Sequence, residues 1–343
     1  MRVENVAGVE SDDRMGVADV TEALELAVRA PSVHNTQPWR WEFGPDGLEL
    51  YADRHRQLAA IDPDGRGLLV SCGAALYLAE LGLAGQGWRV AVSRFPDPAR
   101  PDLLARLVPD GHQQVPAEVR MLLAAAQRRR SERRPFDPRP VPAELLDELR
   151  RLAEHDGGYA HAVTRADERL DLAVVVSWAD QLELDDEAYR AELARWVRPD
   201  AASAREGVPV SAVPRVPAGR ERHTDVPLRD FEVGGRGGLP MPADVDETAA
   251  WLVLFSTGDD PLARLRAGET FAQVAVAAER MGLASSAATQ AIDLPGVRAR
   301  LRALMDWSDH PQMMLRVGWP PAGDAVPATP RRTVADVLTV REK

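Results

Sequence analysis

Apolar and polar positions follow two different periods in the first fifty residues. Residues 21–30 (TEALELAVRA) place Leu24, Ala27 and Val28 on one face, which predicts a short amphipathic helix. Residues 39–53 instead alternate apolar and polar side chains on either side of the turn sequence GPDG (44–47). This alternation predicts a β-hairpin with a tight, glycine-containing turn.

A long apolar segment follows the hairpin. Residues 67–87 (GLLVSCGAALYLAELGLAGQG) are interrupted by Ser71, Gly73 and Glu80, so they predict a buried central helix rather than a membrane span. Residues 88–95 (WRVAVSRF) then predict a strand.

The same order of elements recurs later in the chain. It comprises an amphipathic helix, a buried strand, a helix of small residues and a strand ended by proline, at 142–155, 247–257, 268–286 and 313–320. This recurrence predicts an α+β fold built from two divergent copies of one unit, with mixed or antiparallel sheets flanked by helices. We expect a flexible tail at 1–18, a first repeat at 19–112 and a second repeat at 113–343.

The second repeat contains an irregular segment at 196–242. It is rich in Pro, Gly, Ser and Arg and includes the sequence GGRGGLP. A long irregular stretch inside a compact protein is usually either a functional lid or a disordered loop. The sequence leaves both possibilities open.

Composition narrows the classes of partner. The chain has 343 residues, 45% of them apolar, and a net charge of −11, which favours a soluble globular protein with neither nucleic acid nor an anionic membrane as its partner. Cys72 is the only cysteine, so an internal disulfide and a cysteine-based zinc cage are excluded. We therefore expect a cytoplasmic protein with no metal site.

Lysine is almost absent, since Lys343 is the only one. Without an internal lysine the chain cannot provide a P-loop, a Schiff base with pyridoxal phosphate or a Tyr-x-x-x-Lys dehydrogenase site. Three large enzyme classes are excluded in this way.

The strongest charged feature lies at 127–142 (QRRRSERRPFDPRPVP). Five arginines surround Ser131 within seven positions of an otherwise acidic chain: Arg128, Arg129, Arg130, Arg133 and Arg134. Guanidinium groups and a hydroxyl match the oxygens of a phosphate, so the segment is a candidate phosphate site. The alternative is a solvated basic helix end.

A second polar feature is the loop before the hairpin. Residues 29–43 (RAPSVHNTQPWRWEF) concentrate Ser32, His34, Asn35, Thr36 and Gln37 in one stretch. A helix stop followed by a turn accounts for the proline, and a lone histidine is most often structural. The density of polar side chains nevertheless predicts a ligand with several donors and acceptors.

These two features together resemble a known family. APSVHNTQPWRW (30–41) is similar to the Pro-Ser-x-x-Asn-x-Gln-Pro-Trp loop of the flavin-dependent nitroreductase superfamily, and RRSERRPFDPRPVP (129–142) is similar to its Arg-Arg-Ser-x-Arg-x-Phe motif. LRVGWP (315–320) resembles a late strand of that family. The fused, duplicated arrangement most resembles the Acg branch of FMN-binding proteins, over residues 19–337.

The resemblance implies one complete FMN site per chain, because one chain supplies both halves of the family homodimer. The FMN phosphate and ribityl end would contact Arg129, Ser131 and Arg133, with Arg331 and Arg332 returning to the phosphate. The remaining implied contacts are to the isoalloxazine ring, from Pro31, Ser32, Val33 and Asn35, and to the flavin N5 edge, from Thr289 and Gln290. The family's usual acidic-glycine step is replaced here by Thr289-Gln290.

The implied activity transfers hydride from NAD(P)H through FMN to a small electron-poor acceptor, such as a nitroaromatic or a quinone. No catalytic side chain is required, because the chemistry belongs to the cofactor. The alternative is a non-catalytic FMN-binding or FMN-sequestering protein with segment 196–242 as a lid; a weaker third idea is a tailoring dehydrogenase. The implied assembly is a monomeric pseudo-dimer or a weak homodimer.

Overall fold

A computed structural model describes residues 14–154, 157–198, 201–215, 223–229, 231, 237–241 and 245–341. Residues 1–13 of the expected tail, and parts of the segment 196–242, lie outside the described residues. The first helix, α1 (Val17–Ala27), begins within the range assigned to the tail and packs on the central helix α2 (Arg66–Gly85).

The first sheet is built mainly from the first third of the chain. Its strand order is β13-β1-β2-β4-β3, and its strands are β1 (Trp39–Gly44), β2 (Gly47–Ala52), β3 (Trp88–Arg94), β4 (Leu103–His112) and β13 (Leu338–Val340). The predicted hairpin is confirmed, since Gly44 pairs with Gly47 in an antiparallel ladder. Gly47 has a φ of +107°, a conformation that favours glycine.

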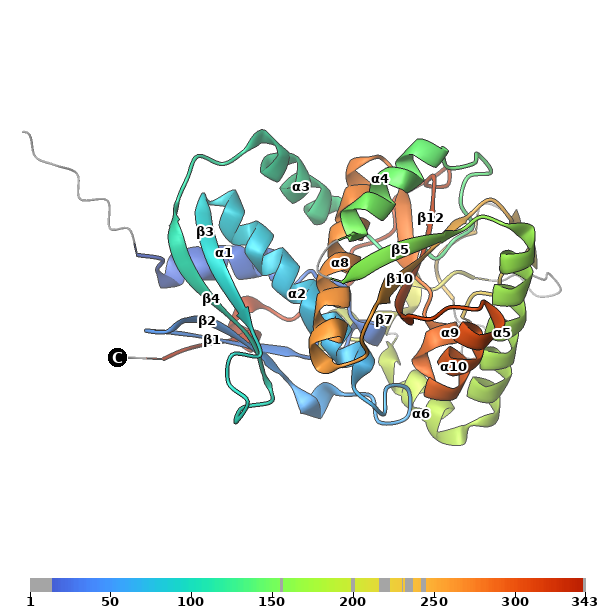
Figure 1. Cartoon of the computed structure of the whole chain (residues 1–343), viewed down its shortest axis with the longest axis horizontal. Helices are drawn as coiled ribbons and strands as arrows, with labels where there is room; N and C mark the ends of the chain where they lie inside the picture. Colours follow the sequence, from blue (N-terminus) through green and yellow to red (C-terminus); the bar gives the residue numbers. More distant parts are fainter. Residues whose placement is uncertain are drawn as a thin grey trace, which may run out of the picture.

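The second sheet is wholly antiparallel. Its order is β11-β12-β10-β5, and its strands are β5 (Gly158–Val163), β10 (Ala250–Ser256), β11 (Ala284–Ala287) and β12 (His310–Gly318). Every residue of β10 is buried, as its continuous apolar sequence AWLVLFS requires. Figure 1 shows the two sheets on opposite sides of a central pair of helices.

Helices α2 and α8 (Pro261–Arg280) form that central pair and touch through glycines. A Cβ atom on Gly73 of α2 would lie 1.9 Å from the carbonyl oxygen of Leu265, and one on Gly268 of α8 would lie 2.0 Å from that of Val70. Both glycines are the eighth residue of a 20-residue helix. This reciprocal contact is consistent with the duplicated α+β unit that the sequence predicts.

The central position of α2 also explains its composition. It is long and apolar enough to cross a membrane, but most of its side chains are buried inside the protein. One core cluster runs from α1 through both central helices to β12 and Val337, so the two halves share this apolar cluster.

The remaining elements surround the two sheets. Helix α3 (Ala117–Arg128) packs on both central helices, and α4 (Ala143–Ala153) packs on β5 and α8. The other helices are α5 (Ala166–Asp185), α6 (Glu187–Trp196), α7 (Ala201–Ala204), α9 (Gln290–Asp293), α10 (Pro295–Leu304) and α11 (Val334–Val337). Short strands are β6 (Val197–Arg198), β7 (Val208–Pro209), β8 (His223–Thr224) and β9 (Val245–Asp246), and single 3₁₀ turns are η1 (Val33–Asn35), η2 (Arg54–Arg56) and η3 (Val210–Ala212).

The end of the chain returns to the first sheet. After β12 the chain runs back, and β13 pairs in parallel with β1, with Leu338 opposite Trp41. Figure 1 shows the carboxyl terminus beside β1 and β2, far from β12. This return path brings residues 329–332 next to the loop that precedes β1.

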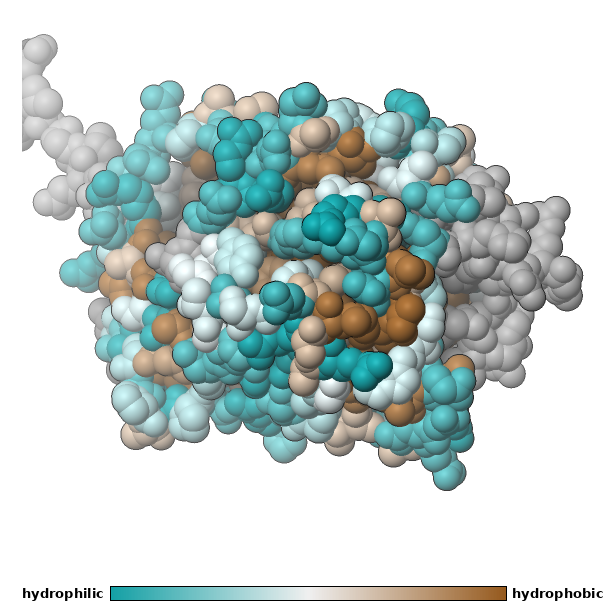
Figure 2. All heavy atoms as spheres, turned by 45° about the vertical axis from the view of Figure 1, so that its right-hand side comes forward, coloured by the Kyte–Doolittle hydropathy of each residue, from teal (hydrophilic) through white to brown (hydrophobic). Residues whose placement is uncertain are grey.

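Helix α5 carries apolar side chains on its outer face as well as on its inner one. Leu170, Val174, Trp178 and Leu182 are all exposed and recur at intervals of four residues. Figure 2, which brings the side of α5 forward, shows apolar groups among the mostly hydrophilic ones of this face.

Candidate flavin site

A cavity lies where the two halves and the end of the chain meet. Its walls come from the loop 31–35, the start of α2, the arginine-rich segment after α3, the β11–α9 connection, residues 329–331 and the irregular segment 196–242, which we call the insertion. Phe271 of α8 and Met313 of β12 complete the lining. Because these segments are far apart in the sequence, only the duplicated fold brings them together.

The loop 31–37 has an unusual backbone. His34, Asn35 and Gln37 have φ angles of 45°, 58° and 52°, in the left-handed region that non-glycine residues seldom adopt. Trp39 and Trp41 follow at once and are completely buried, so they fix the loop to the core. Such local strain persists only where surrounding contacts enforce it, and it is concentrated at functional sites.

Hydrogen bonds from polar side chains hold this loop in place. The Asn35 amide donates to the carbonyl oxygens of Gly207, at 2.9 Å, and Pro330, at 3.0 Å. The Gln37 amide donates to the Arg205 carbonyl at 2.8 Å, and its oxygen accepts from the Arg332 backbone N–H at 2.8 Å. The loop is therefore tied both to the insertion and to the end of the chain.

The arginine-rich segment faces the loop across the cavity. Ser131 forms an isolated parallel bridge with Ser285 of β11, and the Glu132 N–H donates to the Ser285 carbonyl at 3.0 Å. This bridge places Ser131 and Arg133 on the cavity wall, while the side chain of Arg134 turns away to pair with Glu132 at 2.7 Å.

Three arginines of this region have no acidic partner. Within the described part of the chain, Arg129, Arg133 and Arg331 form no ion pair with a carboxylate, and we call them the uncompensated arginines. Burial lowers the pKa of Arg129 to about 10 and that of Arg133 to about 10. Burial, followed by the charges of Arg129 and other neighbouring arginines, lowers the pKa of Arg331 to about 9. This concentration of positive charge is suited to an anion.

Comparison with known proteins identifies the family. No family model matches the chain. A Mycobacterium tuberculosis protein with the provisional name NAD(P)H nitroreductase Rv3131 is 40% identical over 330 residues, covering 93% of this chain and 90% of its own. The provisionally named NAD(P)H nitroreductase acg of the same organism is 33% identical over 340 residues, covering 96% and 98%. The chain belongs to the nitroreductase superfamily, in its Acg-like branch.

Solved nitroreductases are more distant. A nitroreductase with bound FMN from Bacteroides fragilis is 16% identical, with a TM-score of 0.40, and covers 64% of this chain and 98% of its own. One from Desulfitobacterium hafniense, also with bound FMN, is 13% identical, with a TM-score of 0.40, and covers 65% and 98%.

Most of the site residues that the sequence predicts for this nitroreductase-family oxidoreductase line the cavity described above. They are Pro31, Ser32, Val33, Asn35, Ser131, Arg133, Thr289, Gln290 and Arg331. Arg129 is buried beside the cavity rather than on its wall, and it is close enough to lower the pKa of Arg331. Arg332 lies outside the wall, because its guanidinium donates to the carbonyl oxygens of Gln37 and Trp39, at 3.3 and 3.4 Å.

Thr289 and Gln290 stand at the start of α9. The Thr289 hydroxyl donates to Asp293 at 2.8 Å, and the Gln290 amide donates to Asp180 of α5. Both side chains are therefore held by carboxylates.

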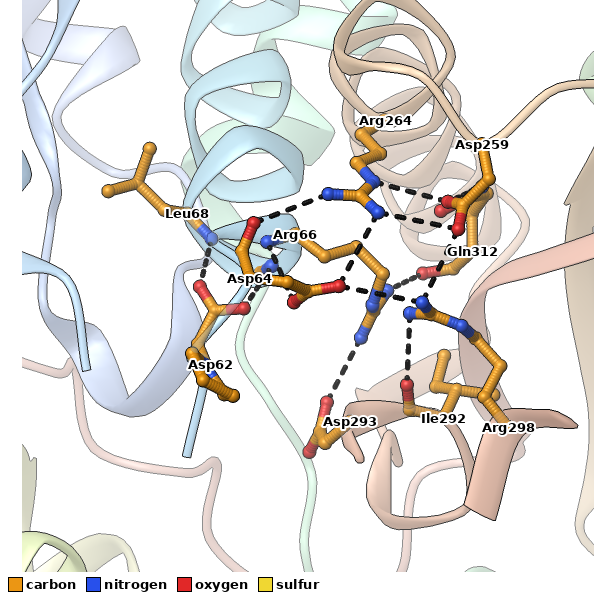
Figure 3. Close-up of polar contacts among 12 residues, drawn as sticks. Asp62, Asp64, Arg66, Leu68, Asp259, Arg264, Ile292, Asp293, Arg298 and Gln312 are labelled. Atoms are coloured by element: carbon orange, nitrogen blue, oxygen red, sulfur yellow. Dashed lines mark hydrogen bonds and ion pairs between the residues drawn. The ribbon is translucent and has the colours of Figure 1, made fainter. Parts of the chain in front are cut away.

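Sequence reasoning missed an ionic network at this end of the cavity (Figure 3). Asp293 accepts hydrogen bonds from Arg66 of α2 at 3.1 Å and from Arg229 of the insertion at 2.9 Å, and Arg229 also pairs with Glu183 of α5 at 2.7 Å. Arg264 and Arg298 pair with Asp64 and Asp259 nearby, at 3.1 to 3.5 Å. We call Arg66, Arg229, Arg264 and Arg298 the compensated arginines.

The insertion supplies a wall of the cavity. Its described lining residues are Val208, Pro214, Leu228, Arg229 and Phe231. Arg229 is almost completely buried, with its guanidinium 5.8 Å from the centre of the Tyr189 ring. The composition of 196–242 gives no sign of this role, since Arg229 acquires its partners Glu183 and Asp293 only in the folded chain.

Proposed function

We propose that the cavity is an FMN site, one per chain, with the phosphate at Ser131, Arg133 and Arg331. The observation that carries this proposal is the group of uncompensated arginines on and beside the wall of one cavity. Arg129 would contribute its charge from behind the wall. A dianionic phosphate ester would offset most of that charge through charge-assisted hydrogen bonds.

The unpartnered polar atoms of the cavity residues fit this cofactor. The Oδ1 atom of Asn35 and the Nε atom of Arg331 are buried and make no hydrogen bond within the described residues. Such atoms cost free energy unless a ligand pairs with them. They lie on two of the segments that the family resemblance assigns to FMN.

The residues of the cavity would bind and orient the cofactor. Pro31, Ser32 and Val33 would flank the ring, and the hydrogen bonds of Asn35 and Gln37 would keep that loop rigid. When bound, FMN supplies a ring that accepts hydride from NAD(P)H and delivers two electrons to a second molecule. The apolar wall residues Phe271 and Leu228 would exclude water from the reacting atoms.

The electron acceptor is proposed to be a small electron-poor aromatic compound, a nitroaromatic or a quinone. The cavity lining combines apolar side chains, among them Phe231, Phe271 and Leu228, with many polar and charged ones. The apolar part of this lining suits a flat organic molecule.

Sequestration of FMN is the second candidate, favoured by the position of the insertion. Arg229 joins the insertion to α5 and α9 through two buried ion pairs, so the wall it forms is fastened to the body of the protein. A cavity wall held in place by these ion pairs would restrict access of NAD(P)H to the flavin.

An absorbance spectrum from 300 to 550 nm, followed by anaerobic addition of NADPH, tests both candidates. Flavin bands that bleach rapidly and return with a quinone or a nitroaromatic support the reductase. Bands that stay oxidised, but bleach when residues 209–240 are replaced by a short linker, support sequestration. A protein that retains no FMN after incubation with it contradicts both.

A further inference from the structure

His34 occupies a distinctive position on the cavity wall. It is only 6% exposed, and its φ of 45° is strained for a residue with a bulky ring. It stands between Val33 and Asn35, which the family resemblance assigns to the flavin, but has no assigned role itself.

The imidazole packs against the insertion. The ring of Phe231 meets it edge to face, with 5.7 Å between the ring centres, and Arg133 lies 5.2 Å from the centre of the same phenyl ring. Burial, together with the charges of Arg229 and Arg133, lowers the pKa of His34 well below its usual range. The ring is therefore neutral at physiological pH, with one nitrogen that donates and one that accepts.

The Nε2 atom of His34 has no partner. It is buried and makes no hydrogen bond within the described residues. Leaving a polar atom buried in this way is unfavourable, and so is the backbone conformation that places it there. Both costs are accounted for if a ligand in the cavity completes the hydrogen bond.

We propose that His34 is a specificity-determining residue that hydrogen-bonds an oxygen atom of the electron acceptor. This inference rests on the proposed function and names the side chain that would recognise the nitro or carbonyl oxygen of its flat aromatic acceptor. The contact with Phe231 shows that an aromatic ring fits against the imidazole edge. Since Phe231 belongs to the insertion, His34 lies where the loop 31–35 meets the part of the cavity wall that the insertion supplies.

Equilibrium binding without turnover tests the proposal. Oxidised, FMN-loaded protein is titrated with 4-nitrobenzamide in the absence of reductant, and binding is followed by calorimetry and by the change in flavin absorbance. His34→Gln keeps a hydrogen-bonding group, whereas His34→Met has similar length and flexibility without one. His161→Gln, on the second sheet and bonded to Glu168, is the control for replacing a histidine elsewhere.

We expect His34→Met to weaken binding of the nitro compound about tenfold, as the loss of one hydrogen bond predicts, and His34→Gln to remain within about threefold of the wild type. The FMN content should be the same in all variants. Equal binding by His34→Met and the wild type overturns the proposal, as does equal weakening in His34→Gln and His34→Met. A wild-type protein that holds FMN but binds no nitro compound also overturns it, whereas one that holds no FMN contradicts the proposed function itself.

Discussion

Two groups of arginines lie on or near the walls of the same cavity, and they differ in their partners. The compensated arginines face Asp64, Asp259, Asp293 and Glu183, so each positive charge is matched within the protein. Among the uncompensated arginines, Arg331 donates to two backbone carbonyls, and the charges of Arg129 and Arg133 lower its pKa. The same residue type therefore joins structural elements in one group and leaves excess positive charge in the other.

The difference in partners predicts that the compensated arginines contribute to the stability of the fold and the uncompensated arginines to the binding of an anion. A buried charge with its counter-ion in place is costly to disrupt, because removing one partner leaves the other buried and unmatched. A buried cluster of like charges is unfavourable until an external anion arrives. The two groups should consequently respond to mutation in opposite ways.

The largest expected effect is on the compensated group. Arg66→Met would remove one partner of Asp293 and the donor to the Gln312 carbonyl, and we expect it to lower the free energy of unfolding by about 3 kcal/mol. Urea unfolding measures this change. The control is Arg40→Met, which breaks the exposed pair with Glu42 and should cost less than about 1 kcal/mol. Equal losses in the two variants would mean that Arg66 contributes no more than a surface ion pair.

The next effect concerns the uncompensated group and FMN. Arg133→Ala should weaken FMN binding roughly 10- to 100-fold, since one or two charge-assisted hydrogen bonds are lost. Quenching of flavin fluorescence on titration gives the dissociation constant. Arg139→Ala, an exposed arginine paired with Asp137 at 2.7 Å, serves as the control. An unchanged affinity for Arg133→Ala would remove the phosphate assignment.

A pH effect should arise beside the compensated group. Burial raises the pKa of Asp62 to about 6, although its carboxylate accepts the N–H groups of Gly67 and Leu68 at 2.8 Å. The folded state therefore binds this proton more tightly than the unfolded state, in which the pKa is about 3.9. Its contribution to stability is fully present below pH 4 and is lost as the pH rises to about 6, by roughly 2 to 3 kcal/mol.

Asp62→Asn isolates this contribution. The difference in unfolding free energy between the variant and the wild type should change between pH 4 and pH 6 and be constant above pH 7. A difference that does not vary with pH would show that Asp62 titrates normally.

The smallest expected effect has the opposite sign to the first. Arg331→Met removes a positive charge from among its like-charged neighbours, so the FMN-free protein should be more stable, by up to about 1 kcal/mol. The same variant should bind FMN less tightly. A clear loss of stability of the FMN-free variant in urea unfolding would mean that a counter-charge stabilises Arg331. The distinction between compensated and uncompensated arginines would then be wrong.

Local patterns were sufficient to predict much of the fold. The hairpin at 39–53 and the central helix at 67–87 were predicted within one or two residues, because alternation and a continuous apolar run are local signals. Helix α5 was not predicted, since Leu170 and Val174 on its outer face obscure the one-sided pattern of an amphipathic helix. Strand β11 was included in the preceding helix because its sequence ASSA has no strand signal.

The candidate site was predictable where one short segment carries the chemistry. Ser131 with its arginines, and the loop from Pro31 to Asn35, are dense enough to be found by inspection. Arg66, Arg229 and Asp293 could not be found in this way, because each is ordinary in its own segment. These residues form ion pairs only because the complete fold brings α2, the insertion and α9 together.

The contact between Gly73 and Gly268 has a consequence for how the sequence of the chain can vary. Because the two central helices meet through backbones that leave no room for a methyl group, neither glycine can be replaced by a larger residue unless the facing helix shifts. A fragment carrying only one half would present its central helix to water along an apolar surface. We therefore expect the two halves to vary more freely in their loops than along these facing central helices.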